Sequence, residues 1–180
     1  LNPPEKQKAS LLLALNKCSD IIPSMISQHQ THNLQDSVLI FTLKNKFNIF
    51  CVFLDYCLNQ IDITQKDAQG NTILLSYLSK RNINYNRIFL LLNKFEKQLD
   101  LNCANNAGNT LLLLTVKNQS NSIFLRSLLT KYGNRININH QNNKGNTAML
   151  IALKKDKVFP AIEFCSILFQ YYQRKIDINR

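Results

Sequence analysis

Five cysteines and three histidines are the residues of this 180-residue chain from which metal sites and nucleophilic active sites are most often built. His29 and His32 have the spacing of half a zinc site, but no Cys-x-x-Cys pair or second His pair accompanies them to complete four ligands. Cys51 and Cys57 are six positions apart on a predicted helix, so they point to different faces. We interpret residues 29–32 as a polar loop and the two cysteines as core residues, and we expect no metal site and no cofactor.

Sequence motifs of the common enzyme classes are absent from the chain. It contains no GxxxxGK[ST], GxGxxG, GxSxG or HExxH pattern, and no local signature ties a histidine to a cysteine. The acidic residues are few, and Asp62, Asp67, Asp100 and Asp177 occupy repeated positions, which does not favour a catalytic carboxylate pair. We therefore predict no catalytic residues, and we expect that the chain is not an enzyme.

Composition and length limit the class of protein. A hydrophobic content of 45% is enough to bury a continuous core, and only 4 Gly and 4 Pro favour helical structure over many tight turns. The odd number of cysteines, mostly within apolar runs, is typical of buried thiols in a reducing, intracellular (cytoplasmic) compartment. No apolar run reaches the roughly 18 residues needed to span a bilayer, so we expect no membrane insertion. The chain begins at Leu1, and we expect it to be a fragment of a longer protein.

The net charge of +11 suits an acidic protein, a nucleic acid or an anionic membrane surface as partner. However, Lys and Asn are scattered along the whole chain, and no run of four basic residues occurs. Charge alone is therefore a weak argument for nucleic-acid binding.

Two sequence markers recur with the same period. The pattern [DN]-x-x-G-N-T occurs at residues 67–72, 105–110 and 142–147, with its glycines 38 and 37 residues apart. A second marker of alternating apolar and polar residues starts at residues 61, 99, 136 and 176. Two markers with one period indicate a repeated supersecondary unit.

Each repeated unit predicts a turn followed by two helices. The glycine permits a positive φ in the turn, and the Thr two positions later can cap the first amides of a helix. We expect first helices at 73–78, 111–116 and 148–153, and second helices at 88–95, 123–129 and 161–172, with loops between them at 79–86, 118–121 and 154–160. Neither helix can bury its apolar face alone, so neighbouring units must stack.

These features resemble the ankyrin repeat, whose pattern is D-x-x-G-x-T-P-L-H-x-A followed by two antiparallel helices. The resemblance implies an all-α ankyrin-repeat solenoid with short β-hairpin fingers and four to five repeats. We expect one domain over 1–180, with a divergent N-terminal capping repeat at 1–33 and repeats at 34–66, 67–104, 105–141 and 142–180. The chain departs from the family because apolar residues replace the Pro and the His, so the usual Thr–His hydrogen bond cannot form.

The resemblance also implies a binding surface, which in ankyrin proteins consists of the hairpin tips and the exposed ends of the first helices. Transferred position by position, the partner-binding residues are Ala68, Gln69, Asn71, Ser79, Lys80, Asn106, Ala107, Asn109, Lys117, Asn118, Asn143, Lys144, Asn146, Lys154 and Lys155. Their lysines would attract an acidic protein surface. Two alternatives stay open: the lysines are ordinary solvated residues, and the repeated Asn serves only the turn.

We thus expect a monomeric protein–protein interaction module. Its Lys- and Asn-rich divergent repeats resemble those in effector proteins that intracellular bacteria deliver into host cells, which implies a host protein as partner in the host cytoplasm. One alternative is a basic solenoid that binds nucleic acid, which we disfavour because the predicted face has no aromatic stacking platform. Another is a domain that recruits substrate for an enzyme whose catalytic domain lies outside this sequence.

Overall fold

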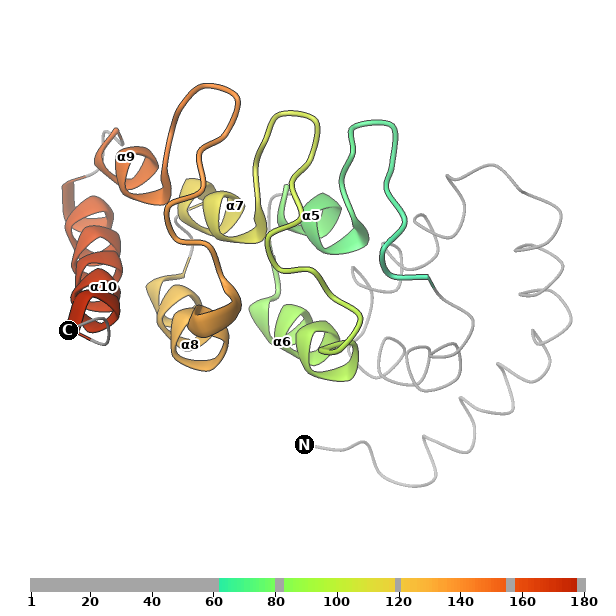
Figure 1. The fold of residues 1–180 in the computed structure, drawn as a ribbon, viewed down its shortest axis with the longest axis horizontal. Helices are drawn as coiled ribbons and strands as arrows, with labels where there is room; N and C mark the ends of the chain where they lie inside the picture. Colours follow the sequence, from blue (N-terminus) through green and yellow to red (C-terminus); the bar gives the residue numbers. More distant parts are fainter. Residues whose placement is uncertain (1–61, 80–82, 119–120, 155–157, 178–180) are drawn as a thin grey trace, which may run out of the picture.

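The computed structural model describes residues 62–79, 83–118, 121–154 and 158–177 (Figure 1). Within these ranges the chain is helical, as predicted. The loops that were expected to be short β-hairpin fingers form no strand in the described residues, and only an isolated antiparallel bridge joins Lys66 to Thr72. The helices are α5 (Ile73–Leu78), α6 (Tyr85–Lys94), α7 (Leu111–Asn118), α8 (Ser122–Tyr132), the 3-10 helix η1 (Gly133–Arg135), α9 (Ala148–Leu153) and α10 (Val158–Asp177). The expected capping repeat at 1–33 lies outside the described residues, and so does the expected repeat at 34–66 up to residue 61. His29, His32, Cys51 and Cys57 all belong to this part of the chain.

The helices form three successive pairs that lie side by side (Figure 1). The short first helices α5, α7 and α9 make one row, and α6, α8 and α10 make the other. Helix α7 contacts both α5 and α9, while α8 contacts α10. The loops that precede the first helices project together on one side of the molecule (Figure 1). The repeated sequence unit thus corresponds to a repeated unit of structure.

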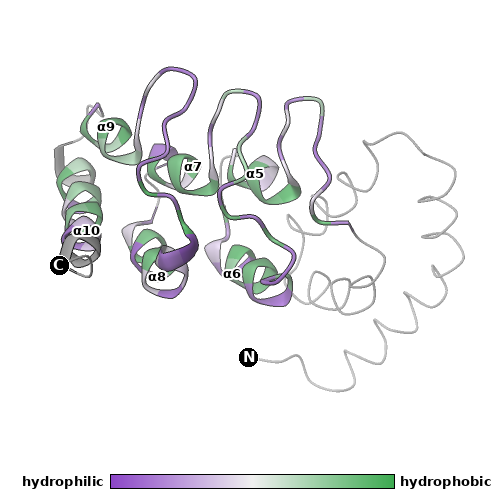
Figure 2. Cartoon of the chain, in the orientation of Figure 1, coloured by the Kyte–Doolittle hydropathy of each residue, from purple (hydrophilic) through white to green (hydrophobic). Residues whose placement is uncertain are grey.

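The hydrophobic core lies between and within the two rows. Figure 2 shows hydrophobic residues gathered on the helices and hydrophilic residues on the projecting loops. All six residues from 111 to 116 are buried, because α7 has a helix on each side as well as α8 beneath it. In the second row, the ring of Phe124 lies 4.6 Å from that of Tyr85 and 4.9 Å from that of Phe89, measured between centroids. Stacking of neighbouring units therefore supplies much of the buried apolar surface.

Polar side chains cap the helices at their first turns. Thr147 and Thr110 accept hydrogen bonds through Oγ1 from the backbone N–H three residues later, which confirms the predicted cap in two of the three units. Thr72 makes no side-chain cap bond. In the second row, Asn84 and Asn121 accept bonds from backbone amides of α6 and α8. Helices α6 and α8 thus have asparagines at their N-caps, where this residue is among the favoured types.

The predicted bounds of the second helices were too short. Helix α6 begins at Tyr85, α8 runs on to Tyr132, and α10 begins at Val158, within a segment predicted to be a loop. Pro160 lies in the first turn of α10. A proline is tolerated in the first turn of a helix, because the amide it lacks would have no intrahelical partner there.

None of the helices in the described ranges combines the length and the apolar character that crossing a membrane would require.

Candidate functional site

The three projecting loops, residues 67–71, 105–109 and 142–146, form what we call the loop row. Each loop is closed by the same turn, in which the glycine N–H donates to the carbonyl of the first loop residue at 2.8 Å. The three glycines, Gly70, Gly108 and Gly145, have φ of 73°, 75° and 70°, as the sequence predicts. Only glycine adopts this backbone conformation without strain, so the turn fixes its identity.

The first residue of each loop also holds the turn through its side chain. Asn105 Oδ1 accepts from the N–H of Ala107 at 3.1 Å and from the N–H of Asn109 at 2.9 Å. Asn142 and Asp67 make the corresponding bonds in their own loops. The loop backbones are therefore held from inside as well as by the glycine turn.

Asparagine amides then connect each loop to the next. Asn105 Nδ2 donates to Asn71 Oδ1 at 2.8 Å, and Asn142 Nδ2 donates to Asn109 Oδ1 at 3.0 Å. We call this series of bonds, together with the backbone bonds described next, the asparagine ladder. Both acceptor residues, Asn71 and Asn109, are buried.

A second set of ladder bonds joins the loop backbones near their tips. The backbone N–H of Asn106 donates to the carbonyl of Gln69 at 2.9 Å, and that of Asn143 donates to the carbonyl of Ala107 at 3.2 Å. Their side-chain amides donate to the carbonyls of Ala68 and Asn106 respectively. The loop row is therefore a hydrogen-bonded assembly rather than three independent loops.

The predicted partner-binding residues divide into two groups in this arrangement. The tip residues are exposed: Ala68, Gln69, Asn106, Ala107, Asn143 and Lys144. Asn71 and Asn109 are instead buried within the ladder. Asn146 is half-buried, and its Oδ1 accepts a bond from Lys154 Nζ at 2.6 Å. Sequence reasoning placed Asn71 and Asn109 at the binding surface, whereas in the structure their side-chain oxygens accept hydrogen bonds from asparagines of the next loop.

The ends of the first helices lie beside the loop row. Ser79 is exposed, and its Oγ donates to the carbonyl of Leu75 at 2.8 Å. Lys117 and Lys154 are exposed, and half-buried Asn118 donates through Nδ2 to the carbonyl of Leu78 in the preceding unit. The remaining two predicted residues, Lys80 and Lys155, lie outside the described residues.

The loop row has an uneven charge, because Asp67 is replaced by Asn105 and Asn142 in the later loops. Burial alone would raise the pKa of Asp67, but hydrogen bonds from Asn71, Ser76 and the N–H of Gln69 together outweigh it and hold the pKa below its usual value. The carboxylate therefore stays ionised at neutral pH and is directed at the loop's own donors. In the second and third loops no acidic residue is present to offset Lys144.

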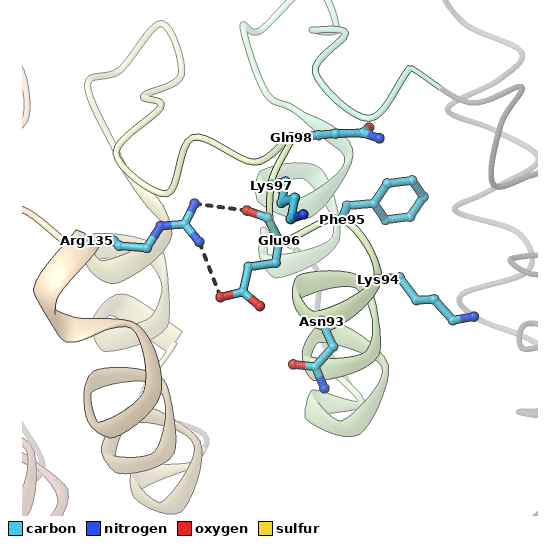
Figure 3. A pocket seen from close by; sticks show the side chains of 7 residues that line it. All are labelled: Asn93, Lys94, Phe95, Glu96, Lys97, Gln98 and Arg135. Carbon is cyan, nitrogen blue, oxygen red and sulfur yellow. Dashed lines mark hydrogen bonds and ion pairs between the residues drawn. The ribbon is translucent and has the colours of Figure 1, made fainter.

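An open pocket of about 750 Å³ lies at the opposite side, beside the C-terminal end of α6 (Figure 3). It is lined by residues 93–98 and by Arg135, which reaches across from the next unit. Arg135 Nη2 donates to the carbonyls of Glu96 and Leu99 at 2.9 and 3.0 Å, and its Nη1 lies 3.6 Å from Glu96 Oε1. Sequence reasoning did not single out Arg135, because its role depends on the spacing of two stacked units. We interpret these bonds as contacts that join the second row.

Among the described residues, no group of three or more His, Cys, Asp or Glu side chains could hold a metal ion. His140 Nε2 lies 2.9 Å from the carbonyl of Gly108, which makes this histidine another contact between loops. Cys103 and Cys165 are half-buried free thiols, and burial raises the pKa of the Cys165 thiol, which disfavours the nucleophilic thiolate.

Comparison with known proteins gives no relative from which a site could be transferred. No protein-family model matches the chain, and no curated protein matches it. The candidate site therefore rests on the residues and their geometry.

Proposed function

We propose that the chain is a stack of ankyrin-type repeats that acts as a protein–protein interaction module and carries out no chemistry of its own. Its binding surface would be the loop row together with the adjacent exposed ends of α5, α7 and α9. The observation that supports this proposal best is the way the loop row separates a fixed framework from variable tips.

The framework positions carry nearly the same residues in all three loops. Counted along the loops, the first residue is Asp or Asn, the fourth is Gly and the fifth is Asn, and each of these makes the internal or ladder bonds described above. The third position differs in every loop, as Gln69, Ala107 and Lys144, and is exposed each time. A rigid framework that presents varied side chains is suited to recognition, because little conformational entropy is lost when a partner binds.

The charge of this surface favours an acidic partner protein. Exposed Lys144 lies at the tip of the third loop, and exposed Lys117 and Lys154 lie at the ends of α7 and α9. A positive surface raises the rate at which an acidic partner is encountered and favours its binding over that of a basic one. As in the bacterial effectors that the repeats resemble, the partner would be a host protein in a reducing compartment.

The test is an affinity pull-down from eukaryotic cell lysate with the full chain as bait, at low and moderate salt, with and without nuclease. The proposal expects recovery of a discrete acidic protein that resists nuclease treatment. Recovery that disappears with nuclease and also falls steeply with salt would instead identify a nucleic-acid-binding protein.

Two variants of equal charge make the pull-down specific for the surface. The first, Lys117→Glu with Lys144→Glu and Lys154→Glu, should abolish recovery of the partner while leaving the helical circular dichroism signal unchanged. The control, Lys94→Glu with Lys97→Glu and Arg126→Glu, changes exposed residues of the second row by the same total charge and should retain the partner. Equal recovery by wild type and the first variant would refute the proposed surface.

A further inference from the structure

The last described unit, α9 with α10, leaves four large apolar side chains exposed. Leu150, Leu153, Ile162 and Phe169 have exposed fractions of 41, 63, 62 and 56% respectively. Two of them lie on α9 and two on α10, the two helices that pack against each other. We call this surface the end face.

The end-face residues correspond to positions that are buried or half-buried in the two preceding units. Counted from the loop glycine, Leu153 corresponds to Leu78 and Val116, both completely buried. Counted back from the second sequence marker, Phe169 corresponds to Leu92 and Leu129, which are also buried.

The other two positions follow the same rule. Leu150 corresponds to the buried Leu75 and Leu113. Ile162 corresponds to Tyr85, whose ring packs on Phe124 of the following unit, and to the half-buried Ser122. The end face therefore continues the interface by which the first unit contacts the second and the second contacts the third.

The loop of the last unit likewise presents to its C-terminal side a surface that the two earlier loops use for contact with the next loop. A Cβ added to Gly70 or Gly108 would lie 2.9 or 2.7 Å from the backbone nitrogen of an asparagine in the next loop. A Cβ at Gly145 would meet nothing within 4 Å. The carbonyls of Asn143 and Lys144 correspond to those of Asn106 and Ala107, which accept the ladder bonds from Asn143.

The ladder is directional, and its direction distinguishes between a second copy of the end face and a further unit as the group that covers the end face. At both observed junctions the earlier loop supplies the acceptors and the later loop supplies the donors of the ladder bonds. A symmetric pair of end faces would bury the apolar side chains, but neither copy would bring the asparagine donors that complete the ladder at the observed junctions. A head-to-tail contact with a unit that brings donors satisfies both the apolar and the polar groups.

We propose that the end face is the docking site for one further helix-pair unit of the same kind, whose loop begins with an Asn-Asn pair. Such a pair provides the donors in both observed junctions, at residues 105–106 and 142–143. The leucines of α9 and Phe169 would pack on its two helices, and its asparagines would donate to the carbonyls of Asn143 and Lys144. This inference does not depend on whether the loop row binds a partner.

The test appends such a unit to the chain and measures thermal unfolding. A copy of residues 140–180 placed after Asn179 keeps the period of the second marker and supplies the Asn-Asn loop. The fusion should unfold in one transition with a Tm about 5 °C or more above that of the chain itself, because each added interface stabilises a stacked array. A second, independent transition or an unchanged Tm would overturn the proposal.

Variants at the end face make the result specific. Leu153→Lys should leave the Tm of the chain almost unchanged, since the side chain is exposed there, but should remove the increase in the fusion. Ile123→Lys is the control, because Ile123 is 75% exposed on α8 and does not belong to the end face. Asn142→Asp with Asn143→Ala, made only in the appended copy, should reduce the increase by removing ladder donors.

Light scattering on the unmodified chain tests the competing occupant. A dimer that Leu153→Lys dissociates and Ile123→Lys does not would show that the end face binds a second copy, and would overturn the proposal. A monomer, together with the Tm increase in the fusion, would support it.

Discussion

Replacing Asn105 with alanine should destabilise the chain, because this side chain holds its own loop and joins it to the preceding loop. Asn105 makes three hydrogen bonds at once: Oδ1 accepts from the amides of Ala107 and Asn109, and Nδ2 donates to Asn71 Oδ1 at 2.8 Å. At about 1 kcal/mol net for each bond, and somewhat more where a buried partner is left unsatisfied, Asn105→Ala should lower the free energy of unfolding by about 2 to 4 kcal/mol.

Urea unfolding followed by far-UV circular dichroism measures this loss, with two variants for comparison. Asn105→Asp keeps both acceptor bonds but cannot donate to Asn71, and it places two oxygens against each other, so it should lose about 1 to 2 kcal/mol at neutral pH. Asn134→Ala removes an exposed asparagine of η1 and should change stability by less than about 0.5 kcal/mol.

The order of the three variants is the informative result. If the free energy of unfolding of Asn105→Ala lies within about 0.5 kcal/mol of the wild-type value, the ladder contributes little to stability and the loops are held by their glycine turns alone. If Asn105→Asp is as stable as wild type, the bond to Asn71 is not important, and the loops are independent of one another.

Three further substitutions test the loops. Gly108→Ala and Gly145→Ala should each lower the free energy of unfolding by about 1 to 2 kcal/mol, because both residues have positive φ. Gly108→Ala should lower it by about 1 kcal/mol more, since its Cβ would lie 2.7 Å from the backbone nitrogen of Asn143. Equal losses in urea unfolding would argue against close contact between the loops. Asp67→Asn should lower stability at neutral pH, because the folded pKa of Asp67 lies below its unfolded value; this stabilisation is complete above the unfolded pKa of about 3.9 and disappears as the pH falls through the folded pKa. The difference in unfolding free energy between wild type and Asp67→Asn should thus shrink between pH 5 and the acid limit of folding, and a difference independent of pH would contradict the prediction.

Sequence reasoning predicted the repeated architecture well because the signals that encode it are local. The glycine, the threonine and the apolar segment of each unit lie within about ten residues of one another, and together they specify a turn, a cap and a first helix. The first helices at 73–78 and 148–153 have the predicted bounds. The remaining first helix, α7, was expected to end at residue 116 but continues to Asn118.

The part that could not be predicted depends on the distance between units. An asparagine in a turn can serve the turn, contact a partner or bond to another loop, and the sequence does not distinguish these roles. The bonds of Asn71 and Asn109 follow only once the stacking of the units sets which groups come within 3 Å. The same holds for Arg135, whose partners belong to the preceding unit.

The use of asparagine where the ankyrin pattern has aspartate connects the framework to the proposed binding surface. Asn105 and Asn142 must donate a hydrogen bond to the preceding loop, and an ionised aspartate has no donor to offer. The ladder thus favours the neutral residue at each junction between loops. One consequence is electrostatic: two negative charges that a more typical repeat would carry beside the loop tips are missing, so the potential of Lys144 and Lys154 is not offset locally. The requirement that joins the loops is therefore also one cause of the positive surface that we propose attracts an acidic partner.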